Sequence, residues 1–504
     1  MKVSATFLAS MLIPLGLGAA ETVNWEASLG GIASSGDFSP YYINSLTHGR
    51  YSQGYTLQAE AAAWRPLDTS RRFSWGYGAD VIAGATSAVG YERYDGATQK
   101  WFTHSERPSA VWLQQLYGEV KYRSVFLYAG MKEETSALLN QKLTSGDLIE
   151  SGNTRPIPQV RAGFIDFQDI PFTDGWVQIQ GEVAYGRMLQ DGWLRDHYNY
   201  YNYHITTGAI YYNYKRCFFR TKPSKPLSLT IGMQAAGIFG GYNRYYKKGE
   251  LTKVLRHSTK LKTFFKMLIP TEDGGDEFYT GSNLGCWDIN LRYRFPSGHE
   301  VKAYTQWLWE DGSGIGKLNG LDGLWGLEYK APRKGYISGA VIEYFDFTNQ
   351  SGPLHFAPGD FEGTTITDHA SGGDDYYNNY TQNSYAYFGQ AIGSPAFLAP
   401  IYNRSGYAGF RANAMRGFHV GVEGDITDEI SYIFKGGYRK AWGNGSFLLP
   451  APVHLSSVMV SGQWSPARVK GLTLNASLEL DRGNMPCNSF GALVGVKYSG
   501  LLNL

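Results

Sequence analysis

Residues 287–295, WDINLRYRF, alternate strictly between apolar and polar side chains. The odd positions are Trp, Ile, Leu, Tyr and Phe, whereas the even positions are Asp288, Asn290, Arg292 and Arg294. A period of two is typical of a β-strand with two different faces. The polar face meets water in a half-buried soluble sheet. In a membrane barrel it lines a wet lumen, while the apolar face meets lipid.

The same alternation recurs along the chain, for example at 177–185, 227–235 and 472–480. Each segment has about nine residues, which is enough for a tilted strand to cross a bilayer. About eighteen strands can be placed in this way. They lie near residues 23, 54, 73, 111, 125, 159, 176, 205, 227, 287, 301, 323, 336, 416, 430, 454, 472 and 489.

The connections between these strands alternate between short and long. Turn 296–298 is followed by loop 310–322, and turn 331–333 by a connection that runs from 347 to about 415. Bacterial barrels have short periplasmic turns and long outer loops, and an even strand number returns the chain to the periplasmic side. The pattern therefore predicts an all-β transmembrane antiparallel barrel in the bacterial outer membrane. A secreted β-sandwich or propeller is the alternative.

Composition supports export to a membrane. Aromatic residues make up 15% of the chain and glycine numbers 62, both high for a soluble globular protein. The net charge of +2 is too small to indicate a nucleic-acid partner. Mean hydropathy is −0.31, and no apolar run of about 18–20 residues follows the N-terminus. Residues 1–20 resemble a secretory signal, with Lys2 before the apolar stretch Ala5–Leu17. Residues 21–504 then form one barrel domain.

Three segments in the long connections predict helices that plug the lumen. Residues 244–268 combine apolar positions near helical spacing with many lysines, which indicates a basic amphipathic helix. Such a helix either binds an anionic glycan or lipid phosphate, or only fills the barrel. Glu133–Leu143 and Tyr385–Leu398 are the other two predicted helices.

Catalytic and metal-binding chemistry finds little support. The sequence contains neither G-x-S-x-G nor H-E-x-x-H, and its three cysteines have no metal-ligand spacing. We therefore expect neither an enzyme nor a bound cofactor. The loops are rich in tyrosine, as at 198–203 and 376–377. These rings either stack on sugars or pack the loops together.

Several longer motifs resemble those of the Wzi family of capsule assembly proteins, in a form typical of the Bacteroidetes. They are GDLIESGNTRPIPQVRAG (146–163), NLGCWDINLRYRF (283–295), WEDGSGIGKLNGLDGLWGLE (309–328), NQSGP (349–353) and DDYYNNYTQNSYAYFGQAIGSPAFLAPIYN (374–403). The resemblance implies an eighteen-stranded barrel, closed by helical segments, that acts as a lectin. It would bind capsular polysaccharide and attach it to the cell surface. The family's helices close the periplasmic end, whereas the loop count here places the insertions on the outside.

The motif residues that fall outside the membrane are the candidates for polysaccharide binding. They are Arg155, Trp309, Glu310, Asp311, Asp322, Asp374, Asp375, Tyr376 and Tyr377. The alternative is that these residues only hold the loops in place. Arg292 and Arg294 are predicted to face the lumen. The expected partners are capsular polysaccharide and outer-membrane lipid, with the protein a monomer. A saccharide diffusion or export porin and a barrel enzyme remain open as other functions.

Overall fold

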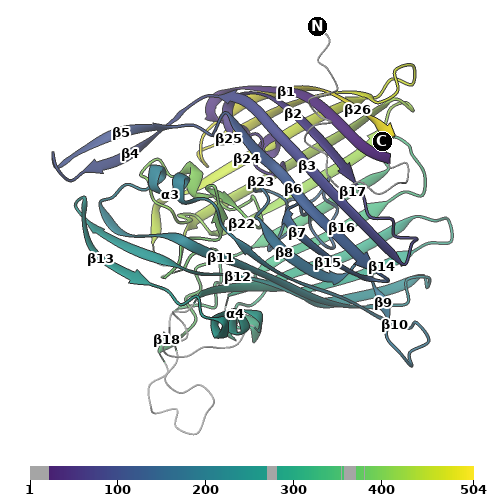
Figure 1. Cartoon of the computed structure of the whole chain (residues 1–504), viewed down its shortest axis with the longest axis horizontal. Coiled ribbons are helices and arrows are strands. Elements are labelled where there is room, and N and C mark those ends of the chain that lie inside the picture. The colour runs from purple at the N-terminus through teal and green to yellow at the C-terminus, as the bar shows by residue number, and fades with distance from the viewer. Residues whose placement is uncertain are drawn as a thin grey trace.

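The computed structural model describes residues 22–269, 281–310, 312–353, 355–356, 370–379, 381–445 and 447–503. The predicted signal segment 1–20 lies outside these residues, as does Asp311 among the candidate binding residues. Within the described chain, eighteen antiparallel strands close into a barrel (Figure 1). The predicted fold class and strand positions are confirmed.

The barrel strands follow one another around the wall in chain order, with short extra strands only in the connections. They are β1 (Thr22–Phe38), β2 (Gln53–Arg65), β3 (Phe73–Thr86), β6 (Val111–Tyr122), β7 (Val125–Met131), β8 (Gln159–Phe164), β10 (Val177–Arg187), β11 (Asn202–Thr221), β12 (Leu227–Lys247), β14 (Gly281–Arg294), β15 (Glu300–Trp309), β16 (Gly323–Lys330), β17 (Gly339–Asp346), β22 (Ala414–Asp425), β23 (Ile430–Gly443), β24 (Leu448–Trp464), β25 (Leu472–Gly483) and β26 (Ser489–Asn503). The two-residue strand β9 (Gln168–Asp169) continues the β8 side of β10.

The two ends of the chain meet at a seam between β1 and β26. The register runs from Thr22 opposite Asn503 to Ser34 opposite Gly491. A short helix, α2 (Tyr41–Asn44), reinforces the outer end of this seam. The backbone N–H groups of Tyr42 and Ile43 each donate to the carboxylate of Glu479 on β25 at 2.7 Å. The first loop is thereby tied to the last hairpin.

The two faces of the wall differ as the alternation predicts. On β14, Asp288 and Asn290 are buried on the inner face, whereas Leu291 and Tyr293 are more than 40% exposed on the outer face. Outward apolar side chains on neighbouring strands form a continuous belt, which includes Leu116, Leu127, Val160, Ile342, Phe418, Val460 and Val494. A closed wall with no free edge and an apolar outer belt is suited to lipid. None of the described helices has the length and apolar character needed to cross a membrane.

Short and long connections lie at opposite ends of the barrel. The short-turn end includes Arg123-Ser124 and residues 222–226, and it is where β1 begins and β26 ends. At the other end the hairpin of β4 (Val89–Asp95) and β5 (Lys100–Glu106) extends away from the wall, as does β13 (Glu250–Arg256) (Figure 1). Because barrels keep short turns in the periplasm, the long-loop end is the outer one.

The lumen is filled by two irregular stretches of the long loops. We call 132–158 the first plug segment and the described residues of 374–413 the second plug segment. Their apolar side chains share one core with inward residues of the wall, for example Leu148, Phe397 and Tyr212. The fill enters from the outer loops, as the loop count predicts.

The predicted plug helices are wrong. Glu133–Leu143 consists of turns and bends. Tyr385–Leu398 contains only the two-residue strands β20 (Ala386–Tyr387) and β21 (Gln390–Ala391). The reason is that side chains from outside these segments bond their backbone: Glu133 N–H donates to Gln115 Oε1 at 3.0 Å, and Phe388 N–H to Gln190 Oε1 at 2.8 Å. Helical i–4 bonds are therefore not needed there.

The predicted basic helix over 244–268 is only partly correct. Its first half is a hairpin in which the end of β12 pairs with β13. Lys248 and Gly249 form the turn with φ of 49° and 83°. Positive φ at both turn residues matches the right-handed twist of a two-residue hairpin. The helix is confined to α4 (Leu261–Leu268).

Candidate functional site

A buried ion-pair network ties the first plug segment to the wall. Arg161 on β8 is 1% exposed. Its guanidinium donates to both carboxylate oxygens of Glu150 at 3.0 and 2.8 Å, and its Nε donates to Glu182 Oε1 at 2.9 Å. Glu134 lies 3.7 Å away. The Tyr214 ring packs 4.5 Å from the guanidinium. One arginine thus links two plug carboxylates to β10.

A second polar cluster links the first plug segment to β12, β14 and β15. Gln306 Nε2 donates to Asp147 at 2.7 Å and to Asp288 at 2.9 Å. Gln234 Nε2 donates to Asp147 at 3.2 Å. Asp147 also accepts the N–H of Ile149 at 2.8 Å. These buried carboxylates have hydrogen-bond partners, among them the Cys286 thiol, which donates to Asp288 Oδ2 at 3.4 Å, so the cluster fastens the plug to the wall.

Asp322 and Tyr376, both candidate binding residues, are buried together. Asp322 is 2% exposed and accepts the N–H groups of Asn349 and Gln350 at 3.1 and 2.8 Å. It also accepts the hydroxyl of Tyr376 at 2.9 Å. Burial raises the pKa of Asp322 to about 6. This aspartate therefore connects the NQSGP loop to the second plug segment.

Glu310, Trp309 and Tyr377 form the adjacent part of the same buried group. Glu310 accepts the N–H of Tyr377 at 2.6 Å, and the Tyr377 hydroxyl donates to the carbonyl of Leu148 at 2.5 Å. Trp309 is 1% exposed and packs over Gly285, where an added Cβ would lie 2.2 Å from the indole. Neither ring presents a face on which a sugar can stack.

Asp374 and Asp375, the other candidate carboxylates that the structure describes, also bond within the protein. Asp374 accepts the hydroxyl of Ser351. Asp375 accepts from the amides of Asn378, at 2.9 Å, and Asn413, and burial raises its pKa. The motif carboxylates and tyrosines are thus one loop scaffold.

The candidate arginines lie apart from this scaffold. The Arg155 guanidinium lies between Trp112 and Phe388, 4.3 and 4.9 Å from the ring centroids. Burial lowers its pKa to about 10. Arg292 and Arg294 lie near the short-turn end of β14 and pair with Glu300 at 3.9 and 2.5 Å.

The outer end carries a cluster of aromatic rings that no motif marked. We define the rim cluster as Tyr94, Trp101, Tyr198, Tyr200, Tyr201 and Tyr246. The rings of Tyr94, Trp101 and Tyr201 lie 4.9–5.3 Å apart, centroid to centroid. Tyr200 lies 4.9 Å from Tyr246. The tyrosines at 198–201 were visible in the sequence, but their partners from β5 and β12 were not.

Backbone hydrogen bonds join the three elements of the rim cluster. Tyr94 N–H on β4 donates to the carbonyl of Asn199 at 2.9 Å. From the β12–β13 turn, Lys248 and Gly249 donate to the carbonyls of Tyr201 and Tyr200 at 2.7 and 2.8 Å. The two hairpins and the 198–201 loop are therefore held as one unit on the outer end.

The rim cluster offers both stacking faces and a hydrogen-bond donor to an outside ligand. Trp101 is 48% exposed, and the neighbouring Phe102 is 45% exposed. The Arg93 guanidinium lies 4.7 Å over the Tyr200 ring. Aromatic faces pack against the C–H surfaces of sugars, and guanidinium groups bond hydroxyls or carboxylates. This combination fits an acidic or neutral glycan.

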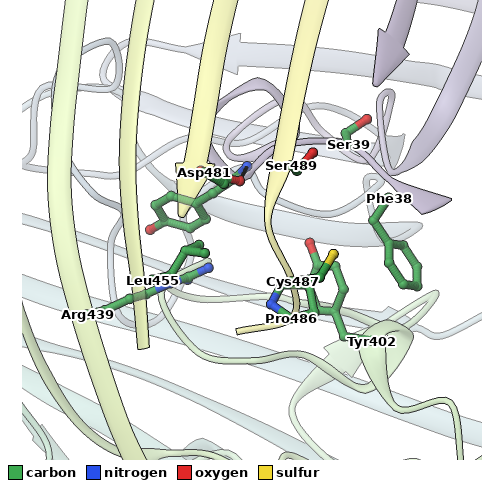
Figure 2. A pocket seen from close by; sticks show the side chains of 10 residues that line it. Phe38, Ser39, Tyr402, Arg439, Leu455, Asp481, Pro486, Cys487 and Ser489 are labelled. Atoms are coloured by element: carbon green, nitrogen blue, oxygen red, sulfur yellow. Dashed lines mark hydrogen bonds between the residues drawn. The ribbon is translucent and has the colours of Figure 1, made fainter. Parts of the chain in front are cut away.

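A small pocket lies near the seam at this end (Figure 2). Phe38, Tyr402, Arg439 and Asp481 are among its lining residues. Phe38 and Tyr402 meet edge to face with centroids 4.9 Å apart. Its free volume is about 10 Å³, roughly the space that one water molecule needs.

Acidification should destabilise α3 (Asp191–His197) and the loops packed against it, which we call the outer cap. The group responsible is His197. Its ring lies 4.5 Å from Trp193 and 4.6 Å from Tyr91, and burial lowers its pKa to about 4. The pKa of His197 in the folded protein is below the ordinary value of 6.5, so folding favours the neutral ring. The outer cap therefore has its full stability above pH 6.5. This stability falls as the pH drops towards 4, by about 3 kcal/mol at the limit. Hydrogen exchange of α3 at pH 7 and pH 4.5 measures the change. Unchanged protection would contradict the expectation.

No family model and no curated protein matches the sequence. Solved barrels resemble the fold. Wzi of Escherichia coli, an outer-membrane protein involved in group 1 capsule assembly and a carbohydrate-binding β-barrel, aligns with a TM-score of 0.53 and 15% identity, covering 94% of this chain and 83% of Wzi. OccAB2 of Acinetobacter baumannii aligns with a TM-score of 0.46 and 10% identity, covering 95% of this chain and 98% of OccAB2. OprD of Pseudomonas aeruginosa aligns with a TM-score of 0.43 and 8% identity, covering 95% of each chain. The structure is thus that of a bacterial outer-membrane β-barrel.

Proposed function

We propose that this protein is a surface lectin that binds capsular polysaccharide and attaches it to the outside of the cell. The observation that carries the proposal is the rim cluster. It presents Trp101, which is 48% exposed, and the Arg93 guanidinium on the outer end of the barrel. The structural similarity to Wzi of Escherichia coli, a carbohydrate-binding β-barrel, supports the same function.

The filled lumen favours a lectin over a porin. The plug segments bring buried, hydrogen-bonded side chains into the middle of the barrel, including Asp147, Glu150 and Tyr377. Barrels of this strand number enclose a water-filled channel unless something occupies it. A saccharide diffusion channel would require at least the second plug segment to leave the lumen.

The test in cells is deletion of the gene, followed by measurement of capsular polysaccharide in the cell pellet and in the medium. A capsule-retaining lectin predicts unchanged total polymer that shifts into the medium. A fall in total polymer with little shedding would point to export or synthesis instead. No change in either pool would contradict the capsule proposal.

Truncating the rim cluster should weaken glycan binding. Replacing Trp101 and Tyr201 together with alanine removes two stacking faces, and we expect about a tenfold or larger loss in affinity for the purified polysaccharide. Isothermal calorimetry or a glycan-coated surface measures this. The single variant Trp101→Phe should retain much of the binding, because it keeps an aromatic face at this position.

The matched control is Trp176→Ala, on the turn before β10. Trp176 is similarly exposed, at 53%, and has a cation–π contact with Lys225 at 5.2 Å. It lies at the short-turn end, where no capsule is expected. Equal loss in this variant, or unchanged binding in the double variant, would contradict a sugar site at the rim.

A further inference from the structure

Helix α4 packs on the outside of the barrel, not in its lumen. Its Phe264 ring contacts Tyr185, Tyr211 and Phe239 at centroid distances of 5.5, 5.2 and 4.9 Å. Tyr211 pairs with Phe239 in the sheet, and alternation on β11 turns the neighbouring Tyr212 inward to the Tyr385 hydroxyl. The contacted rings therefore belong to the outer face of β10, β11 and β12.

The wall is shaped to receive this helix. Gly237 and Gly281 leave space for Met267, since an added Cβ would lie 2.3 Å from Met267 Cε at Gly237 and 2.9 Å from Met267 Sδ at Gly281. Lys215, an outward residue of β11, donates to the carbonyl of Met267 at 2.6 Å. Tyr185 donates to the carbonyl of Phe264 at 2.6 Å. A lysine on the lipid-facing wall is thus covered by α4.

Successive residues of an α-helix are rotated by about 100° around its axis. Helix α4 therefore has three sides that differ in chemical character. Thr263, Phe264 and Met267 face the wall. On the next side Leu261 and Phe265, with Ile269 just beyond the helix, are 73%, 64% and 64% exposed. Lys262 lies on the third side, and the exposed Lys260 precedes the helix. This arrangement suits a segment that lies between a protein wall, acyl chains and charged headgroups.

The height of α4 along the wall agrees with that position. Phe239 lies twelve residues along β12 from its first residue, Leu227. At about 3.4 Å per residue and a tilt of about 40°, it lies roughly 30 Å from the short-turn end. The apolar band of a barrel is about 25 Å tall, so α4 lies at its outer boundary.

We infer that α4 is a lipid-binding element of the outer leaflet. Leu261, Phe265 and Ile269 insert among the acyl chains, while Lys260 and Lys262 bind the phosphate groups of the lipid headgroup. The occupant is an anionic phosphorylated lipid, because the exposed apolar side is continuous with the lipid-facing wall and the exposed charges on the described residues of this segment, Lys260 and Lys262, are positive. The site is separate from the rim cluster and fixes the barrel in its leaflet.

The test is lipid binding by the full-length chain in a neutral detergent, followed by native mass spectrometry. The probes are diphosphoryl lipid A, phosphatidylcholine and inorganic phosphate. We expect Lys260→Gln with Lys262→Gln to weaken lipid A binding about twenty-five-fold, at roughly fivefold per lysine, and to leave phosphatidylcholine binding unchanged. Leu261→Ser with Phe265→Ser should weaken both lipids, since it removes the apolar contact.

The matched control exchanges two exposed lysines at the short-turn end, Lys334→Gln with Lys470→Gln, and should change neither lipid. The compact barrel band on an unheated gel verifies folding of every variant. Equal lipid A binding by the α4 lysine variant and the control would overturn the inference. Displacement of lipid A by millimolar inorganic phosphate, with no effect of the apolar exchange, would also overturn it, because the site would then bind free phosphate.

Discussion

Replacing Arg161 with alanine should lower the free energy of unfolding by about 3–5 kcal/mol. Arg161 is 1% exposed and bonds Glu150 and Glu182, with Glu134 close by. Its removal leaves the buried Glu150 carboxylate without its guanidinium partner, which costs far more than the pair itself contributes, whereas Glu182 keeps Arg216 at 3.1 Å. Denaturant unfolding in lipid vesicles, followed by tryptophan fluorescence, measures the difference.

The control for this prediction is Arg292→Ala. Arg292 is 24% exposed at the side chain and lies 3.9 Å from Glu300, so its pair is partly screened by water. We expect a change of less than about 1 kcal/mol. If Arg161→Ala is as mild as Arg292→Ala, the network does not hold the first plug segment in the way the distances indicate.

Removing the second plug segment should convert the barrel into a channel. We expect that replacing residues 374–410 with a short glycine-serine linker produces stepwise currents in planar bilayers, at least about tenfold above the wild-type level. The reason is that an eighteen-stranded wall encloses an aqueous path when its lumen is not filled. Single-channel recording on the purified protein measures the current.

Shortening the β4–β5 hairpin by residues 96–99 provides the control, because this hairpin extends away from the wall (Figure 1). It should remain as closed as wild type. Open-channel currents in the unaltered protein would contradict the plug and return the saccharide porin to first place among the functions.

The strands were predictable because their signal is local. In β14 the alternation itself distinguishes Asp288, inside, from Leu291, outside, and no other part of the chain is needed to interpret it. The plug was not predictable in detail. Its N–H groups bond Gln306 and Glu343, which lie more than 150 residues away in the sequence, and no local periodicity reveals such partners.

The candidate site was predictable only in composition. An aspartate near tyrosines describes a sugar site and a buried loop scaffold equally well, and only the fold shows that Asp322 bonds Tyr376 out of solvent. The rim cluster was partly missed for a related reason. Trp101 and Tyr246 lie on different hairpins, and only the folded barrel brings them beside the tyrosines at 198–201.

The seam between β1 and β26 sets the order of biogenesis. A wall that closes through its first and last strands stays an open sheet until Ser489–Asn503 has been delivered. The acceptor for the amides of Tyr42 and Ile43 is Glu479, on the hairpin that arrives last. A chain halted before β25 therefore lacks both its closing edge and the anchor of its first loop. Such a chain is an exposed template for aggregation, and periplasmic chaperones and proteases would have to hold or remove it.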